Sequence, residues 1–229
     1  IGTPIEKGFD LLPKGWHGLV EKTTRKALEA ALHSAVFTLK RELKTESANR
    51  LHKVMAAGVG AVGGLGGLPA LTVELPVSTT VMLRSIADIA RSEGHNLSDA
   101  HVKLNCLEVF AFGGPGKDDD GANSGYFAVR MALANMVNDA AKHVAAKGIV
   151  EKSAPALVRV IGQVGSRFGV QVTEKIAAQS IPLVGAAGGA LINTIFIDHF
   201  QNMARGHFIV LRLEEAYGRE VVQGRYTEL

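Results

Sequence analysis

Residues 54–73 read VMAAGVGAVGGLGGLPALTV, and residues 176–197 read IAAQSIPLVGAAGGALINTIFI. Neither run contains a charged side chain, and each is long enough to cross a bilayer as a helix. Both also contain glycines four residues apart, which let helix backbones approach closely in lipid or inside a protein. Glycine contributes little transfer energy, and each run holds a proline. The sequence therefore predicts either two membrane spans or two buried central helices, and the composition favours the buried helices.

The segments around the first run carry a helical pattern. In residues 21–43, apolar side chains recur at spacings of three and four, which predicts an amphipathic helix. Pro76 and Gly94 are expected to begin and end a second helix. Ser98 is expected to cap the next helix, which runs to about Phe112. These signals are typical of helices joined by short turns.

The pattern continues around the second run. Residues 113–125 form a loop rich in turn formers, and residues 126–147 return to helical spacing. Pro155 is expected to open a further helix, and a last helix extends from about Pro182 to Tyr217. No sustained alternation of polar and apolar residues marks a strand.

We therefore expect an all-α protein, a single compact bundle of about seven or eight helices with two central Gly-rich apolar helices. One helical domain is expected to span residues 1–229, with residues 1–20 forming either part of it or an N-terminal extension.

Composition narrows the class of protein. The chain has 229 residues, of which 47% are hydrophobic and 21% charged, so it is suited to a packed core and not to disorder. The net charge is only +3 and aromatic residues make up 6%, whereas nucleic-acid binders concentrate far more basic charge. Cys106 is the one cysteine, so no intrachain disulfide can form, which suits a reducing compartment. We expect no nucleic-acid partner and a cytoplasmic location.

Basic residues in and near the predicted helix 21–43 form a candidate membrane-surface site. A basic amphipathic helix binds anionic membranes through apolar burial and about 1 kcal/mol per nearby Lys or Arg. The same pattern also suits an ordinary surface helix of a bundle, so both interpretations remain open. The residues concerned are Lys22, Arg25, Lys26, Lys40 and Arg41.

Common catalytic and metal-binding signatures are missing from the sequence. It contains no GxxxxGK[ST] phosphate-binding loop, no HExxH and no CxxC. The acidic loop 113–125 lacks the carboxylates that an EF-hand needs at its first and last positions. We expect no cofactor and no metal site.

A few polar residues inside apolar helices are the strongest candidates for a site. Arg84 and Asp88 lie one helical turn apart, and Asn193 and His199 lie in the last long helix. An ionised group inside a tight apolar bundle is costly unless it has a partner. These residues therefore either form buried pairs that fix helix register or line a ligand-binding or catalytic site.

Three blocks of the chain, in this order, resemble the EcsC family: LPALTVELPVSTTVMLRSIADIARSEGHN at 68–96, FGGPGKDDDGANSGYFAVRMAL at 112–133 and IPLVGAAGGALINTIFIDHFQNMARGHF at 181–208. The resemblance covers most of the chain from about residue 20 onward. It implies a bacterial helical protein. The family takes its name from a member encoded beside the ATPase and membrane subunits of an ABC transporter, and no reaction belongs to the family as a whole. The matching residues that become site candidates are Arg84, Asp88, Tyr126, Arg130, Pro182, Asn193 and His199.

Three hypotheses about function follow. The first is a noncatalytic protein that binds reversibly to the inner face of the cytoplasmic membrane, through lipid or through a membrane protein such as an ABC transporter component. The second is a hydrolase or small-ligand-binding enzyme with a polar site inside the bundle. The third is a homo-oligomer assembled through glycine faces. The sequence favours the first hypothesis and leaves enzymatic activity open.

Overall fold

The computed structural model describes residues 15–38, 49–113, 123–147, 154–179 and 185–228. These residues form seven α-helices and one 3-10 turn, with no strand among them, which confirms the predicted all-α bundle. In chain order the elements are α2 (Trp16–Thr38), α3 (Asn49–Ser92), α4 (Ala100–Glu108), η1 (Val109–Ala111), α5 (Asn123–Lys147), α6 (Pro155–Gln179), α7 (Gly185–Tyr217) and α8 (Arg219–Thr227).

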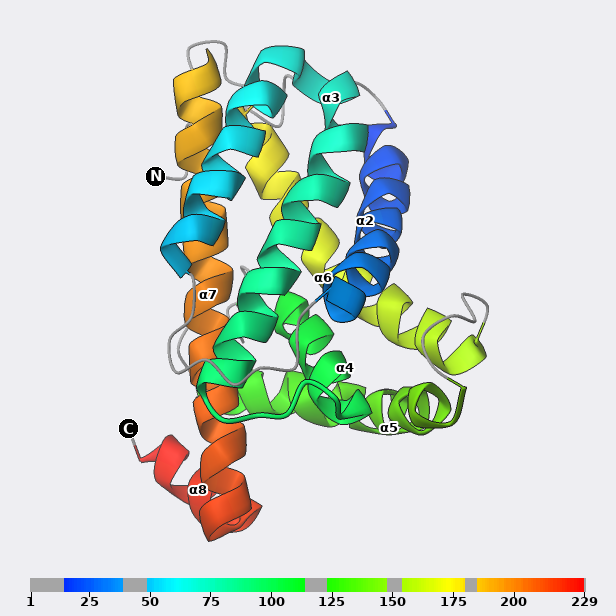
Figure 1. The fold of residues 1–229 in the computed structure, drawn as a ribbon, viewed down its shortest axis with the longest axis vertical. Coiled ribbons are helices and arrows are strands. Elements are labelled where there is room, and N and C mark those ends of the chain that lie inside the picture. The colour runs from blue at the N-terminus through cyan, green and yellow to red at the C-terminus, as the bar shows by residue number, and fades with distance from the viewer. Residues whose placement is uncertain (1–14, 39–48, 114–122, 148–153, 180–184, 229) are drawn as a thin grey trace.

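Helix α3 is helical over 44 residues but reverses direction between its two ends (Figure 1). The reversal falls in the glycine-rich run, where glycines and Pro69 weaken the straight helix. It divides α3 into a first arm, residues 49–59, and a second arm, residues 72–92. The expected helix start at Pro76 is wrong, because α3 continues through that residue. There the Thr80 hydroxyl donates a hydrogen bond of 2.8 Å to the Pro76 carbonyl oxygen.

Helix ends follow local backbone chemistry at most of the expected places. The predicted ends before Gly94 and Gly218 are confirmed, and both glycines have φ values, +96° and +85°, that suit a residue without a side chain. The predicted cap Ser98 is wrong by one residue. Asp99 caps α4 instead, since its carboxylate accepts a hydrogen bond of 2.8 Å from the backbone N–H of His101.

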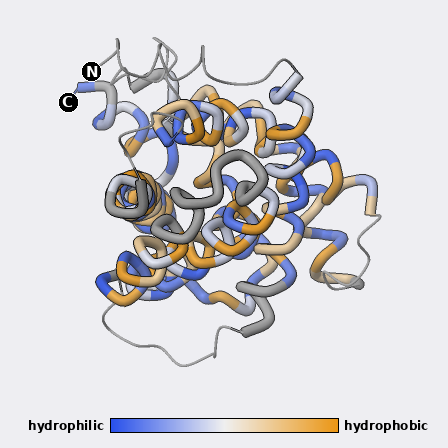
Figure 2. Tube along the Cα trace, turned by 90° about the horizontal axis from the view of Figure 1, so that it is seen from above, coloured by the Kyte–Doolittle hydropathy of each residue, from blue (hydrophilic) through white to orange (hydrophobic). Residues whose placement is uncertain are grey.

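The bundle is arranged around α3, which lies between α2 and α7 (Figure 1). Helix α7 runs along the long axis of the molecule and is seen nearly end-on when the bundle is viewed from above (Figure 2). Helix α6 packs against α2 and α5, while α4, α5 and α8 lie at the end of the bundle opposite the reversal of α3. The molecule therefore has two distinct ends.

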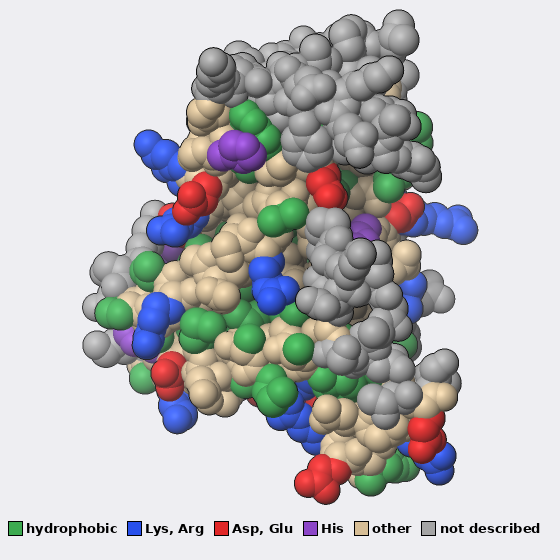
Figure 3. All heavy atoms as spheres, turned by 180° about the vertical axis from the view of Figure 1, so that it is seen from behind, with side chains coloured by type: hydrophobic (Ala, Val, Ile, Leu, Met, Phe, Trp, Pro, Cys, Tyr) green, Lys and Arg blue, Asp and Glu red, His purple; other side chains and the backbone are tan. Residues whose placement is uncertain are grey.

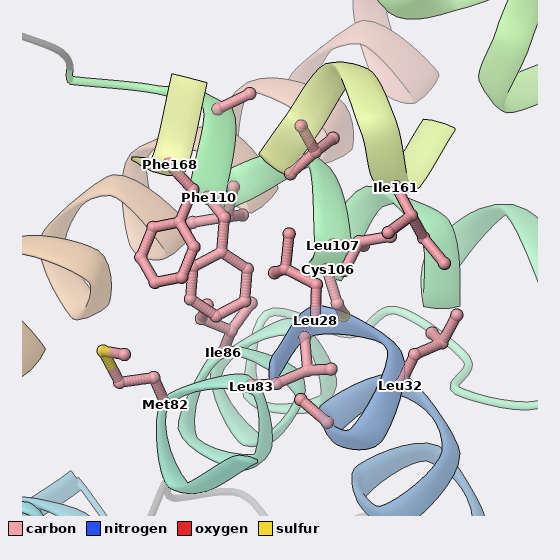
Figure 4. Packing of buried hydrophobic residues seen from close by; sticks show 14 of the residues in the cluster. Leu28, Leu32, Met82, Leu83, Ile86, Cys106, Leu107, Phe110, Ile161 and Phe168 are labelled. Carbon is pink, nitrogen blue, oxygen red and sulfur yellow. The ribbon is translucent and has the colours of Figure 1, made fainter. Parts of the chain in front are cut away.

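The core is aromatic at its centre. Phe110, Phe168 and Phe200 are fully buried, and their ring centroids lie 4.7, 5.0 and 5.5 Å apart. Figure 4 shows Phe110 and Phe168 next to each other, with Ile86 of α3 beside them. Leu28, on the apolar side of α2 predicted from its spacing, is also fully buried. The rings thus join η1, α6 and α7 in one core.

The two charge-free runs do not form two straight helices. The run 54–73 contains the reversal of α3, and the run 176–197 is divided between the end of α6 and the beginning of α7. Within the parts of the chain that the structure describes, no helix is long and apolar enough to cross a membrane.

Replacement of Phe200, whose ring contacts both Phe110 and Phe168, tests this core. We expect Phe200→Ala to lower the free energy of unfolding by about 3–5 kcal/mol, because it leaves a cavity among buried rings. Urea denaturation followed by circular dichroism measures the loss. Val170→Ala, at a 47% exposed position on α6, is the control and should cost less than about 0.5–1 kcal/mol. Equal losses in the two variants would contradict this description of the core.

Candidate functional site

A buried polar cluster lies where α4, α5 and α7 meet. The Tyr126 hydroxyl is 2.8 Å from Nδ1 of His207, and Nε2 of His207 is 4.0 Å from Oε2 of Glu108. The His207 side chain is completely buried and that of Glu108 is 6% exposed. Three helices therefore contribute one polar group each to a row of phenol, imidazole and carboxyl.

Aromatic rings enclose this cluster and keep it dry. The Phe112 ring lies 5.1 Å from the Tyr126 ring and 5.0 Å from the His207 ring, centroid to centroid. Tyr226 of α8 stacks on Tyr126 at 5.8 Å, and Phe127 contacts both tyrosines. Helix α8 thus covers the row from the outside.

Burial shifts the protonation equilibria of all three groups. It raises the pKa of Glu108 to about 7, although the positive charge of Arg130 opposes the shift. Burial also lowers the pKa of His207 well below its usual value, and Arg130 and His95 add to this effect. Burial raises the pKa of Tyr126 as well. At neutral pH both the phenol and the imidazole are therefore uncharged.

A neutral imidazole carries a proton on one of its two ring nitrogens, so one nitrogen of His207 is a donor and the other an acceptor. When the Tyr126 hydroxyl donates to Nδ1 of His207, the imidazole proton lies on Nε2 and is directed toward Glu108. Glu108 is the member of this row that changes charge near neutral pH. Glu108 can therefore hold a proton in this cluster, and the contacts among the three side chains can fix the register of α4, α5 and α7.

An ion pair closes the cluster toward solvent. Arg130 of α5 donates two hydrogen bonds of 2.8 Å to the two carboxylate oxygens of Glu214 on α7, and both side chains are 11% exposed. The guanidinium carbon also lies 5.4 Å from the centroid of the Tyr126 ring. Burial by itself would lower the pKa of Arg130, but the contact with Glu214 raises it overall. The pair is bidentate and compensated, so it holds α5 against α7.

A second buried ion pair adjoins the charge-free runs. Glu74 directly follows residues 54–73, and Lys175 directly precedes residues 176–197. Their side chains are 5% and 1% exposed, and Nζ lies 2.7 Å from Oε1. Burial lowers the pKa of Lys175, whereas Glu74 opposes that shift. The Lys175 ammonium also faces the Phe196 ring at 5.3 Å. This pair joins α3 to α6 at the border of both runs.

The structure separates most of the residues predicted from the sequence. Arg84 and Asp88 lie on the second arm of α3 and interact electrostatically with His52 of the first arm, while Asp88 also pairs with Arg91. Burial lowers the pKa of His52, with Asp88 opposing and Arg84 reinforcing the shift. These residues therefore belong to the contact between the two arms of α3.

Asn193 and His199 lie in two further places. The Asn193 amide donates a hydrogen bond of 2.9 Å to the carbonyl oxygen of Ala56, which joins α7 to the first arm of α3. His199 lies against the turn at Gly113, where φ is +72° and a side-chain carbon would come within 2.5 Å of the imidazole. Burial lowers the pKa of His199. Pro182, the remaining family-matching residue, lies outside the described residues.

The structure thus groups four of the six predicted site residues into two separate pairs: Tyr126 with Arg130, as a cation–π contact, and Arg84 with Asp88, beside His52. The neighbours of Tyr126 and Arg130, namely His207, Glu108 and Glu214, are not among the residues predicted from the sequence. No local pattern links Tyr126 with His207, which is 81 positions away. Within the described ranges, no three His, Cys, Asp or Glu side chains gather closely enough to hold a metal ion.

The predicted basic surface is present in part. Lys22, Arg25 and Lys26 are exposed on α2. Arg25 lies 3.9 Å from Glu21, and Glu29 is exposed on the same helix, so the acidic residues reduce the local charge. The other two residues of this prediction, Lys40 and Arg41, lie outside the described residues. On the face seen in Figure 3, acidic and basic side chains are interspersed among the described residues.

These observations define a protein that is helical throughout its described segments and in which two largely buried ion pairs, Arg130–Glu214 and Glu74–Lys175, join neighbouring helices. The chain belongs to the EcsC protein family, whose model matches residues 1–213, and the resemblance predicted from the three sequence blocks is thereby confirmed. No curated protein and no solved structure matches the chain.

Replacing Glu108 tests the protonation of the polar cluster. Because its pKa rises from 4.5 to about 7 on folding, the native state binds a proton more tightly than the unfolded chain. Stability from this group is therefore full below about pH 4.5 and is lost as pH rises to about 7, by roughly 3 kcal/mol. We expect Glu108→Gln, which keeps the neutral shape, to gain that amount relative to wild type between pH 5 and 8.

Urea denaturation at several pH values measures this difference. His207 and His199 change stability in the opposite direction, since their pKa values fall on folding, and both residues are present in wild type and in Glu108→Gln. Glu215→Gln, at an exposed position on α7, is the control. Parallel pH curves for wild type and Glu108→Gln would show that Glu108 is ionised like an exposed glutamate.

A double-mutant cycle tests the Glu74–Lys175 ion pair. We expect Lys175→Met to lower the free energy of unfolding by about 3–5 kcal/mol, because the carboxylate of Glu74 is left buried without its partner. Adding Glu74→Leu should restore most of the loss. The exposed pair Arg225–Glu228 serves as a control, and its single variants should change stability by less than about 1 kcal/mol. Additive losses at positions 74 and 175 would rule out the coupling.

Proposed function

We propose that this protein is a peripheral membrane protein that docks on a bilayer with one end of its bundle, the charge-free end, defined by the described parts of the two charge-free runs, residues 54–73, 176–179 and 185–197. The observation that carries the proposal is the convergence of these two runs. The reversal of α3, the end of α6 and the beginning of α7 lie at the same end of the molecule (Figure 1). The described parts of two charge-free segments about a hundred positions apart in sequence thereby come together at one end of the molecule.

Exposed hydrophobic side chains support this orientation. Seven of the fourteen exposed large hydrophobic residues in the described chain lie on the two arms of α3 and in the first turns of α7. A concentration of exposed apolar side chains is typical of protein-binding or membrane-binding surfaces. The seven residues are Leu51, Val54, Met55, Val73, Val77, Leu191 and Ile195.

Docking at this end requires little desolvation of charge. Of the four charged residues that border the two runs, Glu74 and Lys175 are buried and paired, and Lys53 and Asp198 form a second pair with side chains 38% and 41% exposed. Apolar side chains gain about 25 cal/mol for each Å² that they transfer from water. Burial of apolar side chains is therefore expected to provide most of the free energy of membrane binding at this end.

Electrostatic attraction adds a smaller contribution. Exposed Lys22, Arg25 and Lys26 on α2 attract anionic lipid by about 1 kcal/mol each when they lie near the surface. Glu21 and Glu29 on the same helix reduce this attraction. Salt screens such contributions, so binding to anionic vesicles should weaken but persist as the salt concentration rises.

The same surface suits a membrane-protein partner, with ABC transporter components among the candidates, and the inner face of the cytoplasmic membrane is the proposed location. A homo-oligomer would use the same apolar side chains. An enzyme has weaker support, since the six predicted site residues do not converge. Tyr126 contacts Arg130, which is already paired with Glu214, while Arg84 and Asp88 lie at a separate place beside His52.

Sedimentation with vesicles tests the proposal. We expect wild type to pellet with phosphatidylcholine vesicles, and more strongly with vesicles that also contain phosphatidylglycerol. The double variant Val73→Glu/Leu191→Glu should lose at least about ten-fold in affinity for both, because a loss of 1.4 kcal/mol is sufficient for that factor. The triple variant Lys22→Ala/Arg25→Ala/Lys26→Ala should lose only the preference for anionic vesicles.

The matched control is Met131→Glu/Val221→Glu, which places the same charges at positions that are 63% and 58% exposed on α5 and α8. This control should bind as wild type does. If wild type fails to pellet with either vesicle at low salt, the proposed function is wrong. If the control loses binding as strongly as Val73→Glu/Leu191→Glu, docking does not occur at the charge-free end.

A further inference from the structure

The first arm of α3 (residues 49–59) turns its apolar side away from the protein. Leu51, Val54 and Met55 are 60%, 71% and 41% exposed, and their spacing of three and four residues places them on one side of the helix. Among the described side chains of this arm, Ala56 alone is fully buried. The second arm is different, because it buries large side chains such as Met82 and Ile86.

Polar contacts hold the first arm in place. Lys53 forms an ion pair with Asp198 of α7, and the two side chains are 38% and 41% exposed. Asn193 of α7 donates a hydrogen bond to the Ala56 carbonyl oxygen. Exposed ion pairs contribute little net stability, because water replaces the contact when it breaks. Water can therefore replace the Lys53–Asp198 contact, whereas the Asn193–Ala56 hydrogen bond is buried and must be broken for the arm to leave α7.

The charge of the arm indicates its binding partner. Residues 49–59 contain Arg50 and Lys53 and no acidic residue. A helix with one apolar side and a basic polar side lies in the interface of an anionic membrane, with its apolar side among the acyl chains and its cations near the headgroups. Anionic lipid therefore fits both sides of the arm.

The arm also adjoins a segment that can act as a hinge. The chain reverses direction between the two arms, within a run that contains Gly58, Gly60, Gly63 and Gly64. Glycine lowers the cost of changing backbone direction inside a helix. Hinges commonly consist of a few residues that absorb such a change.

We propose that the first arm of α3 is a releasable membrane-inserting element, which leaves α7 on an anionic bilayer and places Leu51, Val54 and Met55 among the acyl chains. The inference rests on the proposed membrane function and adds a conformational change to it. In the closed arrangement the polar side of the arm contacts α7, and in the released arrangement this side contacts lipid headgroups and water.

Cysteine reactivity distinguishes release from docking without release. Ala56→Cys lies on the side of the arm that contacts α7, and Val54→Cys lies on the exposed apolar side. Each variant is treated with a water-soluble maleimide, with and without vesicles of phosphatidylcholine and phosphatidylglycerol. Wild type provides the background, since Cys106 is buried and burial raises the pKa of its thiol.

On addition of vesicles we expect the labelling rate at position 56 to rise at least ten-fold and the rate at position 54 to fall at least ten-fold. A fall at position 54 with no rise at position 56 would overturn release while leaving the proposed membrane function intact. Unchanged rates at both positions in protein that pellets with vesicles would overturn insertion of the arm. Failure of wild type to pellet would instead reject the proposed function.

A second variant tests release without changing the buried residue Ala56. Asp198→Asn removes the ion pair that holds Lys53 and should raise the affinity for anionic vesicles about two- to five-fold. Asp139→Asn makes the same change of charge in the exposed Arg159–Asp139 pair, so it controls for the lost negative charge. Equal affinities in the two variants would overturn release.

Discussion

The buried contact between Glu74 and Lys175 constrains how the two charge-free runs can be arranged. Each residue directly adjoins one of the runs, and both side chains are almost completely removed from water. A lone charge at this depth would be strongly unfavourable, so the pair is stable only when α3 and α6 are in one register. In that register the reversal of α3 and the beginning of α7 lie at the same end of the molecule (Figure 1). The apolar end therefore depends on a charged contact.

The opposite end of the bundle buries polar side chains from three helices in one cluster. Tyr126, His207 and Glu108 form a row that is dry because aromatic rings surround it, and the Arg130–Glu214 pair closes its outer side. The charges near this row are compensated within the protein. The two ends thus differ: one buries a cluster of polar side chains, and exposed apolar side chains lie on the helices that lead to the other.

The features that the sequence predicted correctly are those set by residues close together in the chain. The all-α class follows from spacing, and the ends before Gly94 and Gly218 follow from glycines that accept a positive φ. The reversal within α3 was not predictable in this way, since Pro76 and the glycines suggested separate helices and tertiary packing kept them in one. The candidate site has the same limit. Tyr126 and Arg130 lie one turn apart, but their partners, His207 for Tyr126 and Glu214 for Arg130, are distant in sequence, and no spacing rule connects them.

Helix α2 and the first arm of α3 have similar sequence patterns but turn opposite sides toward the protein, which is why we propose membrane contact for the arm. Both segments are helices with basic residues and an apolar side, and periodicity alone cannot tell which side faces the protein. In α2 the apolar side meets α3 and α6, and Leu28 is buried, as in an ordinary surface helix. The first arm of α3 instead meets Asn193 and Asp198, which offer polar partners. Its apolar side is consequently directed outward, where lipid can cover it.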